Sequence, residues 1–270
     1  MYGGVAGRTS HLESSIPLIL IIILAIFIAG NFGLVNFSDV PLLGSIFGGK
    51  QIKVGVVGSP SPGLKDLLLT KDAQEAGIHM MGILRPESLV ASGTLKSFDV
   101  VILQGKQVCD RTARRVLTEW VKGGGKLFVI GDACTRVSDD PAAFGWDVGG
   151  NLGDVMPVKI GGITHQAEPV RRGCSSGMFR FADFAHPIGA GIDDFHFSGT
   201  TIDVTPWTNG NIVSYIDCSD SGKGNVATTP AIVESTGGLG GKVIYWAYDP
   251  GSSSRNLFIN ALKYVKNQKG

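Results

Sequence analysis

The sequence contains little charge and almost no net charge. Only 17% of its 270 residues are Asp, Glu, Lys or Arg, and 24 basic side chains balance 23 acidic ones, for a formal net charge of +1. A typical globular protein has about 25% charged residues. Because no basic field is available to attract a polyanion, the composition argues against nucleic acid as a partner.

Motifs for metals and nucleotides are also missing. No Cys or His spacing matches a zinc site. The loop 58–63, GSPSPG, has neither the Gly-x-Gly-x-x-Gly fingerprint nor the lysine of a P-loop. Asp132, Asp139 and Asp140 lie close together with Arg136, but solvated loop charges explain such a group better than a cation site does. We therefore expect no metal and no cofactor.

One segment lacks charge entirely. Residues 16–35, IPLILIIILAIFIAGNFGLV, have Asn31 as their one strongly polar side chain. A helix of this length spans about 30 Å, the thickness of a bilayer core, and it would have no polar face. We expect a single transmembrane anchor over 15–37, after a short tail at 1–14. A cleaved signal peptide is the alternative, although no clean cleavage pair follows the apolar run.

The charges beside this segment give a weak positive-inside bias. Arg8 precedes the apolar run and is offset by Glu13, and Asp39 follows the run. A short tail before a single span most simply stays inside. We therefore expect a single-pass membrane protein whose large domain is extracytoplasmic.

The rest of the chain alternates between strand-like and helix-like segments. A linker with Pro41 and three glycines covers 38–50. Helices are expected at 62–77, 86–97, 110–125 and 252–268, and strands at 51–59, 78–84, 98–105, 126–132, 154–162, 195–204, 211–219, 230–236 and 237–249. This order predicts an α/β fold with a doubly wound, mostly parallel sheet in three α/β/α layers, carrying a β-rich insertion or extension and preceded by one transmembrane helix.

Three stretches resemble a known superfamily. They are VKGGGKLFVIGDA at 121–133, HPIGAGI at 186–192 and GKVIYWAYDPG at 241–251. With the layout of strands and helices, they are similar to the class I glutamine amidotransferase-like superfamily, which has a flavodoxin-like fold. The chain most resembles ThuA-like and related non-glutaminase domains over about residues 51–268. The resemblance implies the fold and leaves the function open.

The catalytic motifs of the superfamily are not kept. Active members have Gly-x-Cys-x-Gly at the end of a strand, and here Ala133 stands in the nucleophile position while Cys134 comes one residue late. Active members also have His-Pro-Glu after a late strand, where this chain has Asp249, Pro250 and Gly251. An unactivated thiol is a poor nucleophile, so we expect no glutaminase activity and a Cys134 side chain that points away from the pocket.

Several residues remain candidates for a site at the carboxyl edge of the sheet. If the protein is an enzyme, the candidate catalytic residues are Cys134, Asp132, Asp249 and His186. The candidate ligand-binding residues are Ser59, Gln104, Asp132, Arg136 and Asp249. His165 and His196 are further histidines that a fold could bring near Cys134, and Trp146 and Trp207 could stack on a sugar ring or simply pack.

The chain has only four cysteines, too few for a disulfide framework in a chain of this length. In a fold of this type, Cys109 and Cys134 would follow two neighbouring strands and leave from one edge of the sheet. The resemblance therefore implies a Cys109–Cys134 bridge, and Cys174–Cys218 would be the other pair. Both bridges require an oxidising exterior.

Two classes of function stay open. The first is a membrane-anchored, non-catalytic domain that binds a protein partner or a small ligand at the cell surface. The second is a hydrolase or carbohydrate-processing enzyme that uses a pocket at the carboxyl edge of the sheet.

Overall fold

A computed structural model describes residues 51–91, 93–106, 108–160, 174–218, 227–235, 241–252 and 255–267. Residues Ile52–Gly270 form one compact unit. The expected tail, anchor and linker at 1–14, 15–37 and 38–50 lie outside the described residues, as does His165. Within the described ranges, no helix is both long and apolar enough to cross a membrane.

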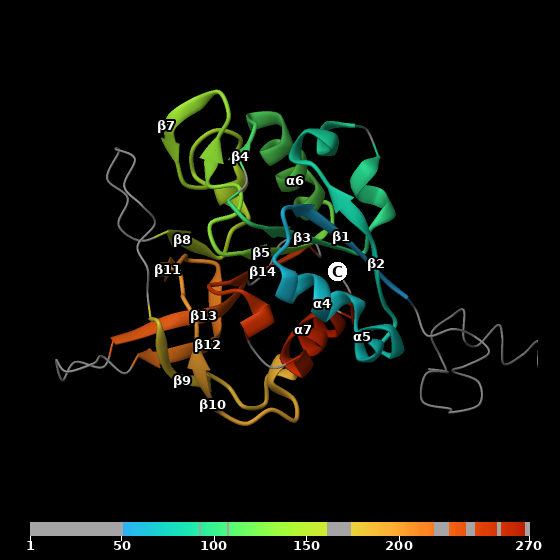
Figure 1. The fold of residues 1–270 in the computed structure, drawn as a ribbon. Helices are drawn as coiled ribbons and strands as arrows, with labels where there is room; N and C mark the ends of the chain where they lie inside the picture. Colours follow the sequence, from blue (N-terminus) through green and yellow to red (C-terminus); the bar gives the residue numbers. More distant parts are fainter. Residues whose placement is uncertain are drawn as a thin grey trace, which may run out of the picture. The chain divides into compact units, whose positions relative to one another are not determined.

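A nine-stranded sheet runs through the middle of this unit (Figure 1). Its strand order is β10-β9-β12-β13-β14-β5-β3-β1-β2. The parallel strands are β1 (Ile52–Gly58), β2 (Ile78–Leu84), β3 (Val100–Gln104), β5 (Lys126–Ile130) and β14 (Lys242–Trp246). The antiparallel strands are β9 (Ser176–Phe181), β10 (Phe195–Ser198), β12 (Gly210–Cys218) and β13 (Ala227–Ser235). The expectation of a mostly parallel sheet is wrong, because the sheet is mixed: the β-rich half joins the parallel half through antiparallel pairing of β13 with β14 and extends the same sheet.

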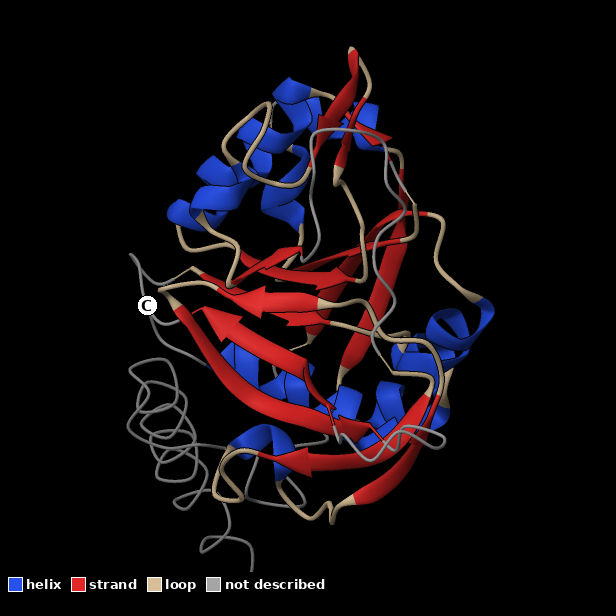
Figure 2. Cartoon of the chain, turned by 90° about the vertical axis from the view of Figure 1, so that its left-hand side faces the viewer, coloured by secondary structure: helices blue, strands red, loops and turns tan. Residues whose placement is uncertain are grey.

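Helices cover both faces of the sheet, and Figure 2 shows the sheet between two groups of them. Helices α4 (Pro62–Leu69), α5 (Lys71–Glu75) and α7 (Arg255–Asn267) bury their apolar residues against one face. Helix α6 (Arg111–Lys122) packs on the other face. This arrangement confirms the α/β class.

Aromatic side chains hold α7 to the sheet. Phe258 is 1% exposed and makes edge-to-face contacts with Phe128, at 6.1 Å between ring centroids, and with Trp246, at 5.8 Å. Full burial of one large apolar side chain contributes about 1.5–3 kcal/mol. The C-terminal helix is thus fixed beside the last parallel strand.

Short elements complete the fold. The 3₁₀ turns are η2 (Pro86–Val90), η3 (Thr94–Ser97), η4 (Leu152–Asp154), η5 (Pro187–Gly189) and η6 (Pro250–Ser252). The small strands β4 (Val108–Cys109), β6 (Arg136–Val137) and β7 (Asp140–Phe144) form one sheet, and β8 (Val158–Ile160) and β11 (Val204–Pro206) form another.

Two expected helices differ from the structure for local reasons. The helix expected at 62–77 divides at Thr70, which has an extended backbone and whose hydroxyl caps α5 by accepting from the Ala73 N–H. A threonine hydroxyl that bonds the backbone competes with helix continuation. The helix expected at 86–97 is two 3₁₀ turns, separated where Gly93 has a φ of 88°.

Candidate functional site

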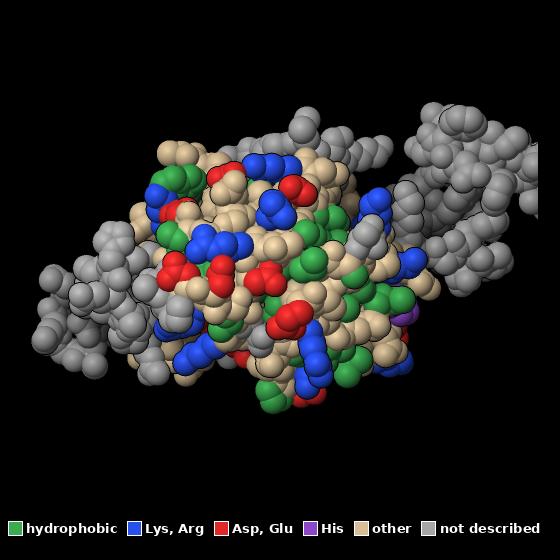
Figure 3. Space-filling view, turned by 90° about the horizontal axis from the view of Figure 1, so that it is seen from above, with side chains coloured by type: hydrophobic (Ala, Val, Ile, Leu, Met, Phe, Trp, Pro, Cys, Tyr) green, Lys and Arg blue, Asp and Glu red, His purple; other side chains and the backbone are tan. Residues whose placement is uncertain are grey.

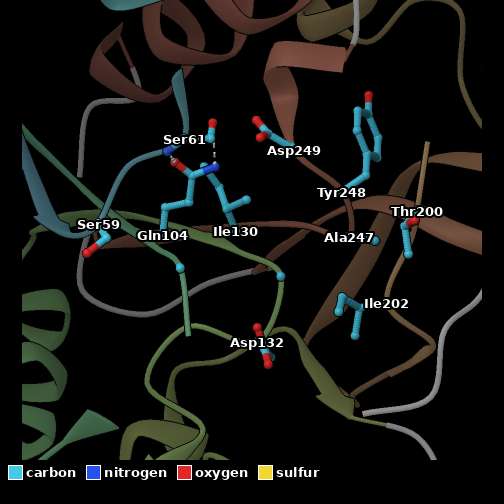
Figure 4. Close-up of a pocket in the computed structure, with 12 residues that line it drawn as sticks. Ser59, Ser61, Gln104, Ile130, Asp132, Thr200, Ile202, Ala247, Tyr248 and Asp249 are labelled. Carbon is cyan, nitrogen blue, oxygen red and sulfur yellow. Dashed lines mark hydrogen bonds between the residues drawn. The ribbon is translucent and has the colours of Figure 1, made fainter. Parts of the chain in front are cut away.

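A pocket of about 280 Å³ lies where β1, β3, β5 and β14 end. Carboxyl ends of parallel strands are where open α/β sheets bind ligands. Figure 4 shows its walls, which come from four loops. They are lined by Ser59, Ser61, Gln104, Gly105, Ile130, Gly131, Asp132, Thr200, Ile202, Ala247, Tyr248 and Asp249.

The first wall is the loop between β1 and α4, held by Gln104 at the end of β3. The Gln104 side chain is buried; its Oε1 accepts from the Ser61 N–H at 2.8 Å, and its Nε2 donates to Ser61 Oγ at 3.2 Å. Ser61 Oγ also accepts from the Leu64 N–H at 3.0 Å and so caps α4. Gln104 therefore fixes the start of α4 relative to the sheet.

The second wall is the turn after β5. Gly131 leaves the strand with a φ of 66° and donates its N–H to the Trp246 carbonyl at 2.8 Å. The Asp132 carbonyl then accepts from the Thr135 hydroxyl at 2.7 Å. Trp146, which is buried, donates from Nε1 to the Ala133 carbonyl at 2.9 Å. These bonds hold the half-buried Asp132 at the pocket while Ala133 turns into the core.

Cys134 does not line the pocket. Its side chain is fully buried, its φ is 56°, and the structure bridges it to Cys109 with 5.0 Å between the Cα atoms. β3 and β5, the strands that precede these cysteines, are parallel neighbours. A bridged, buried sulfur presents no thiolate, so this arrangement offers no nucleophile at the position.

The third wall follows β14. Asp249 Oδ1 accepts from the Gly251 N–H at 2.9 Å. A Cβ built on Gly251 would lie 2.6 Å from the Gly63 Cα, so the two loops meet backbone to backbone. A side chain cannot fit here without moving one loop. Position 251, which the sequence resemblance matched to a glutamate of active members, is thus closed to any residue except glycine.

The fourth wall, Thr200–Ile202, comes from the antiparallel half and no sequence signal identified it. Ile202 donates its N–H to the Ala247 carbonyl at 2.7 Å. Thr201 donates its N–H to the Cys174 carbonyl at 3.0 Å, and Cys174 is bridged to Cys218 with a Cα separation of 5.5 Å. Each disulfide therefore supports one wall of the pocket.

The structure brings together four of the five candidate ligand-binding residues. Ser59, Gln104, Asp132 and Asp249 line the pocket. Arg136 does not; it is exposed in the small strand β6, and its guanidinium carbon lies 5.3 Å from the centre of the Phe144 ring.

His186 lies in a different polar cluster, near the start of β14 rather than its end. Its Nε2 is 3.5 Å from Glu234 Oε1. Glu234 Oε2 accepts from Lys242 Nζ at 2.8 Å and from the Tyr264 hydroxyl at 2.9 Å. Burial would raise the pKa of this carboxyl, but the hydrogen bonds from its partners outweigh burial and lower the pKa to about 2. His186 is therefore engaged away from the pocket.

The tryptophans give no support for stacking in the pocket. Trp146 is 2% exposed in the core. Trp207 is 39% exposed, but Lys159 Nζ lies 3.0 Å from its ring centre, and neither ring lines the pocket. Among the residues that the structure describes, no group of three or more His, Cys, Asp or Glu could hold a metal ion.

The face of the molecule seen from above in Figure 3 has mixed charge. Figure 3 shows basic and acidic side chains interspersed on the face seen from above. Arg111 pairs with Asp139 at 3.0 Å and with Asp140 at 3.4 Å, and Lys122 pairs with Asp154 at 2.9 Å. Exposed pairs of this kind contribute about 0–1 kcal/mol each to the stability of the fold.

Solved structures share this fold. No family model and no curated protein matches the chain. A putative ThuA-like protein from Parabacteroides merdae matches with a TM-score of 0.54 and 15% identity, over 82% of this chain and 91% of that one. A cytoplasmic protein from Salmonella typhimurium LT2 matches with a TM-score of 0.55 and 13% identity, over 80% and 100%.

A β-galactosidase from Bacillus circulans sp. alkalophilus also matches, with a TM-score of 0.54 and 14% identity. The match covers 80% of this chain but only 30% of the enzyme. Identities this low show the fold alone. The protein is thus an α/β protein with a ThuA-like fold, and its function has to be argued from its own pocket.

Proposed function

We propose that the protein is a single-pass membrane-anchored, non-catalytic domain with a glutamine amidotransferase-like fold that binds a small polar ligand at the cell surface. The observation that carries the proposal is the pocket, where hydroxyl, carboxylate and amide groups converge from four loops. A concave site with a few convergent polar groups is the usual form of a ligand site.

The residues at the family's catalytic positions support binding over catalysis. Ala133 stands in the nucleophile position, Cys134 is bridged and buried, and Gly251 has no room for a side chain. No described residue of the pocket is a histidine or a cysteine. A hydrolase remains the second candidate because Asp132 and Asp249 both line the pocket, where carboxylates could act as acid or base.

A ligand library tests the proposal. The full-length protein in detergent micelles is mixed with small polar compounds, and thermal unfolding is followed by tryptophan fluorescence. We expect hits that raise the melting temperature of the wild type and of Asp66→Asn, an exposed carboxylate on α4 outside the pocket. The double variant Asp132→Asn/Asp249→Asn should lose them. Hits that persist in the double variant would place binding elsewhere.

Activity is measured on the same panel. We expect no turnover of ester, amide or glycoside substrates by any variant. Turnover that is lost in Asp132→Asn or Asp249→Asn would replace the binding proposal with the hydrolase.

A further inference from the structure

The charge on the described walls of the pocket is entirely negative. Asp132 and Asp249 are its charged residues, and no Lys, Arg or His in the described chain lines it. Figure 4 shows the two carboxylates on opposite sides of the view, Asp249 above and Asp132 below. A ligand between them would have to compensate their charge.

Neither of these two carboxylates is ion-paired within the described ranges, whereas several carboxylates elsewhere on the surface are. Arg111 holds Asp139 and Asp140, and Arg180 holds Asp194 and Asp217. Arg136 follows Asp132 by only four residues, but it lies over the Phe144 ring instead.

Most N–H groups at the start of α4, where an α/β pocket usually binds an anion, are missing or already used. The start of a helix binds anions through its free N–H groups. At the start of α4, Pro62 has no N–H, and the Leu64 N–H donates to Ser61 Oγ at 3.0 Å. The Ser61 N–H donates to Gln104 Oε1 at 2.8 Å. A phosphate or carboxylate would therefore meet two carboxylates and few donors.

A third carboxylate, Asp203, acts on the same buried tyrosine as Asp132 does, although it does not line the pocket. Asp203 follows Ile202, which lines the pocket. Burial raises the pKa of the Tyr245 hydroxyl well above its ordinary value, and the negative charges of Asp132 and Asp203 raise it further. Tyr245 is fully buried in the core and therefore stays a neutral phenol.

We infer that the ligand of this pocket is a small molecule that bears an ammonium group, and that the pocket rejects phosphates and carboxylates of the same size. The inference rests on the proposed ligand-binding function and names its ligand class. A cavity of about 280 Å³ is at the small end of ligand sites. Carboxylate oxygens would accept the ammonium hydrogens, and the exposed Thr200, which also lines the pocket, carries a hydroxyl for the polar remainder of the ligand.

Three probes of matched size separate charge from shape. Ethanolamine, ethylene glycol and glycolate each carry a hydroxyl group and are respectively positive, neutral and negative at neutral pH. Each is titrated at constant ionic strength into full-length protein in detergent micelles, labelled with ¹³C on isoleucine methyl groups. Ile130 and Ile202 line the pocket and report binding; Ile→Val substitutions assign their signals.

We expect ethanolamine to shift both methyl signals at lower concentration than the other two probes. Asp132→Asn and Asp249→Asn should each raise the ethanolamine midpoint by roughly ten-fold, because a hydrogen bond to a charged group is lost. Asp66→Asn removes the same charge on the exposed side of α4 and should leave the midpoint unchanged.

Three results would overturn the inference. These are tighter binding of glycolate than of ethanolamine, an ethanolamine midpoint that is the same in both pocket variants as in the wild type, and no methyl shift with any probe. If no probe shifts the methyl signals, the ligand library still tests the broader binding function, and its hits would then be neutral or acidic compounds. The two failures are therefore distinguishable.

Discussion

Glu234 is the buried carboxyl of the polar cluster that it forms with His186, Lys242 and Tyr264, and it links β13 to α7. Its side chain is 8% exposed and receives hydrogen bonds from Lys242 and Tyr264. Asn211 donates to its other oxygen at 3.3 Å. A buried carboxylate with this many donors is stabilised as the anion, so the cluster stabilises the fold while the carboxylate is charged.

Glu234→Gln should lower the free energy of unfolding by about 3 kcal/mol at pH 7, because a pKa lowered from 4.5 to about 2 corresponds to roughly that much stability. This stability is present above the unfolded-state pKa and is lost as the pH falls toward the folded-state pKa. The difference between wild type and variant should therefore shrink from about pH 5 to about pH 2.

Urea titrations at several pH values, followed by tryptophan fluorescence, measure this difference. Glu87→Gln is the matched control, since Glu87 is exposed on η2. If the difference in unfolding free energy between wild type and Glu234→Gln does not change with pH, the carboxylate charge does not contribute to stability and the substitution removes only packing.

At the level of loops and strands, the pocket depends on elements that are distant in sequence. Three of its walls follow β1, β5 and β14 in the parallel half, the first of them held by Gln104 at the end of β3, and the fourth, Thr200–Ile202, comes from the segment between β10 and β11. Gly63 and Gly251 bring the loops after β1 and β14 into backbone contact. The bridges at Cys134 and Cys174 join the two remaining walls to neighbouring segments.

The bridges should protect these walls from local opening. Cys109→Ser/Cys134→Ser removes a cross-link over a sequence separation of 25 residues, and a loop of about that length contributes roughly 3 kcal/mol. Amide hydrogen exchange should become faster in 131–135. In Cys174→Ser/Cys218→Ser it should become faster at Thr201 instead, so each variant is the control for the other.

Thiol labelling tests the bridges directly. The denatured, unreduced protein should label at none of its four cysteines, and the reduced protein at all four. Four reactive thiols before reduction would remove both bridges and argue for a reducing compartment.

For the whole molecule, the membrane segment stays a prediction that rests on composition. Full-length protein should remain with membranes after an alkaline wash, and deletion of residues 1–50 should release a soluble, folded domain. Added protease should digest the domain in intact cells if it faces outward. Full-length protein in the soluble fraction after the wash would contradict the anchor, and protection in intact cells would reverse the orientation.

The α/β class and four pocket residues could be predicted from the sequence because they depend on local patterns. Apolar runs of strand length followed by glycine or a polar residue mark strand ends, and Gln104, Asp132 and Asp249 all stand at such ends. Parallel strands bring their carboxyl ends to one edge, which placed these side chains together.

Contacts between distant segments needed the tertiary structure. Arg136 has a loop-like sequence context, but pairing of β6 with β4 and β7 carries it away from the pocket. The strand predicted over 195–204 is two strands, β10 and β11, and Thr200 and Ile202 lie between them. They reach the pocket because the Ile202 N–H bonds to the Ala247 carbonyl, which follows β14. The periodicity of side chains along the sequence indicates which face of a helix or strand is buried. It does not indicate which segment covers that face, because that depends on the order of the strands in the sheet and on the paths of the loops. Residues far apart in the chain determine both.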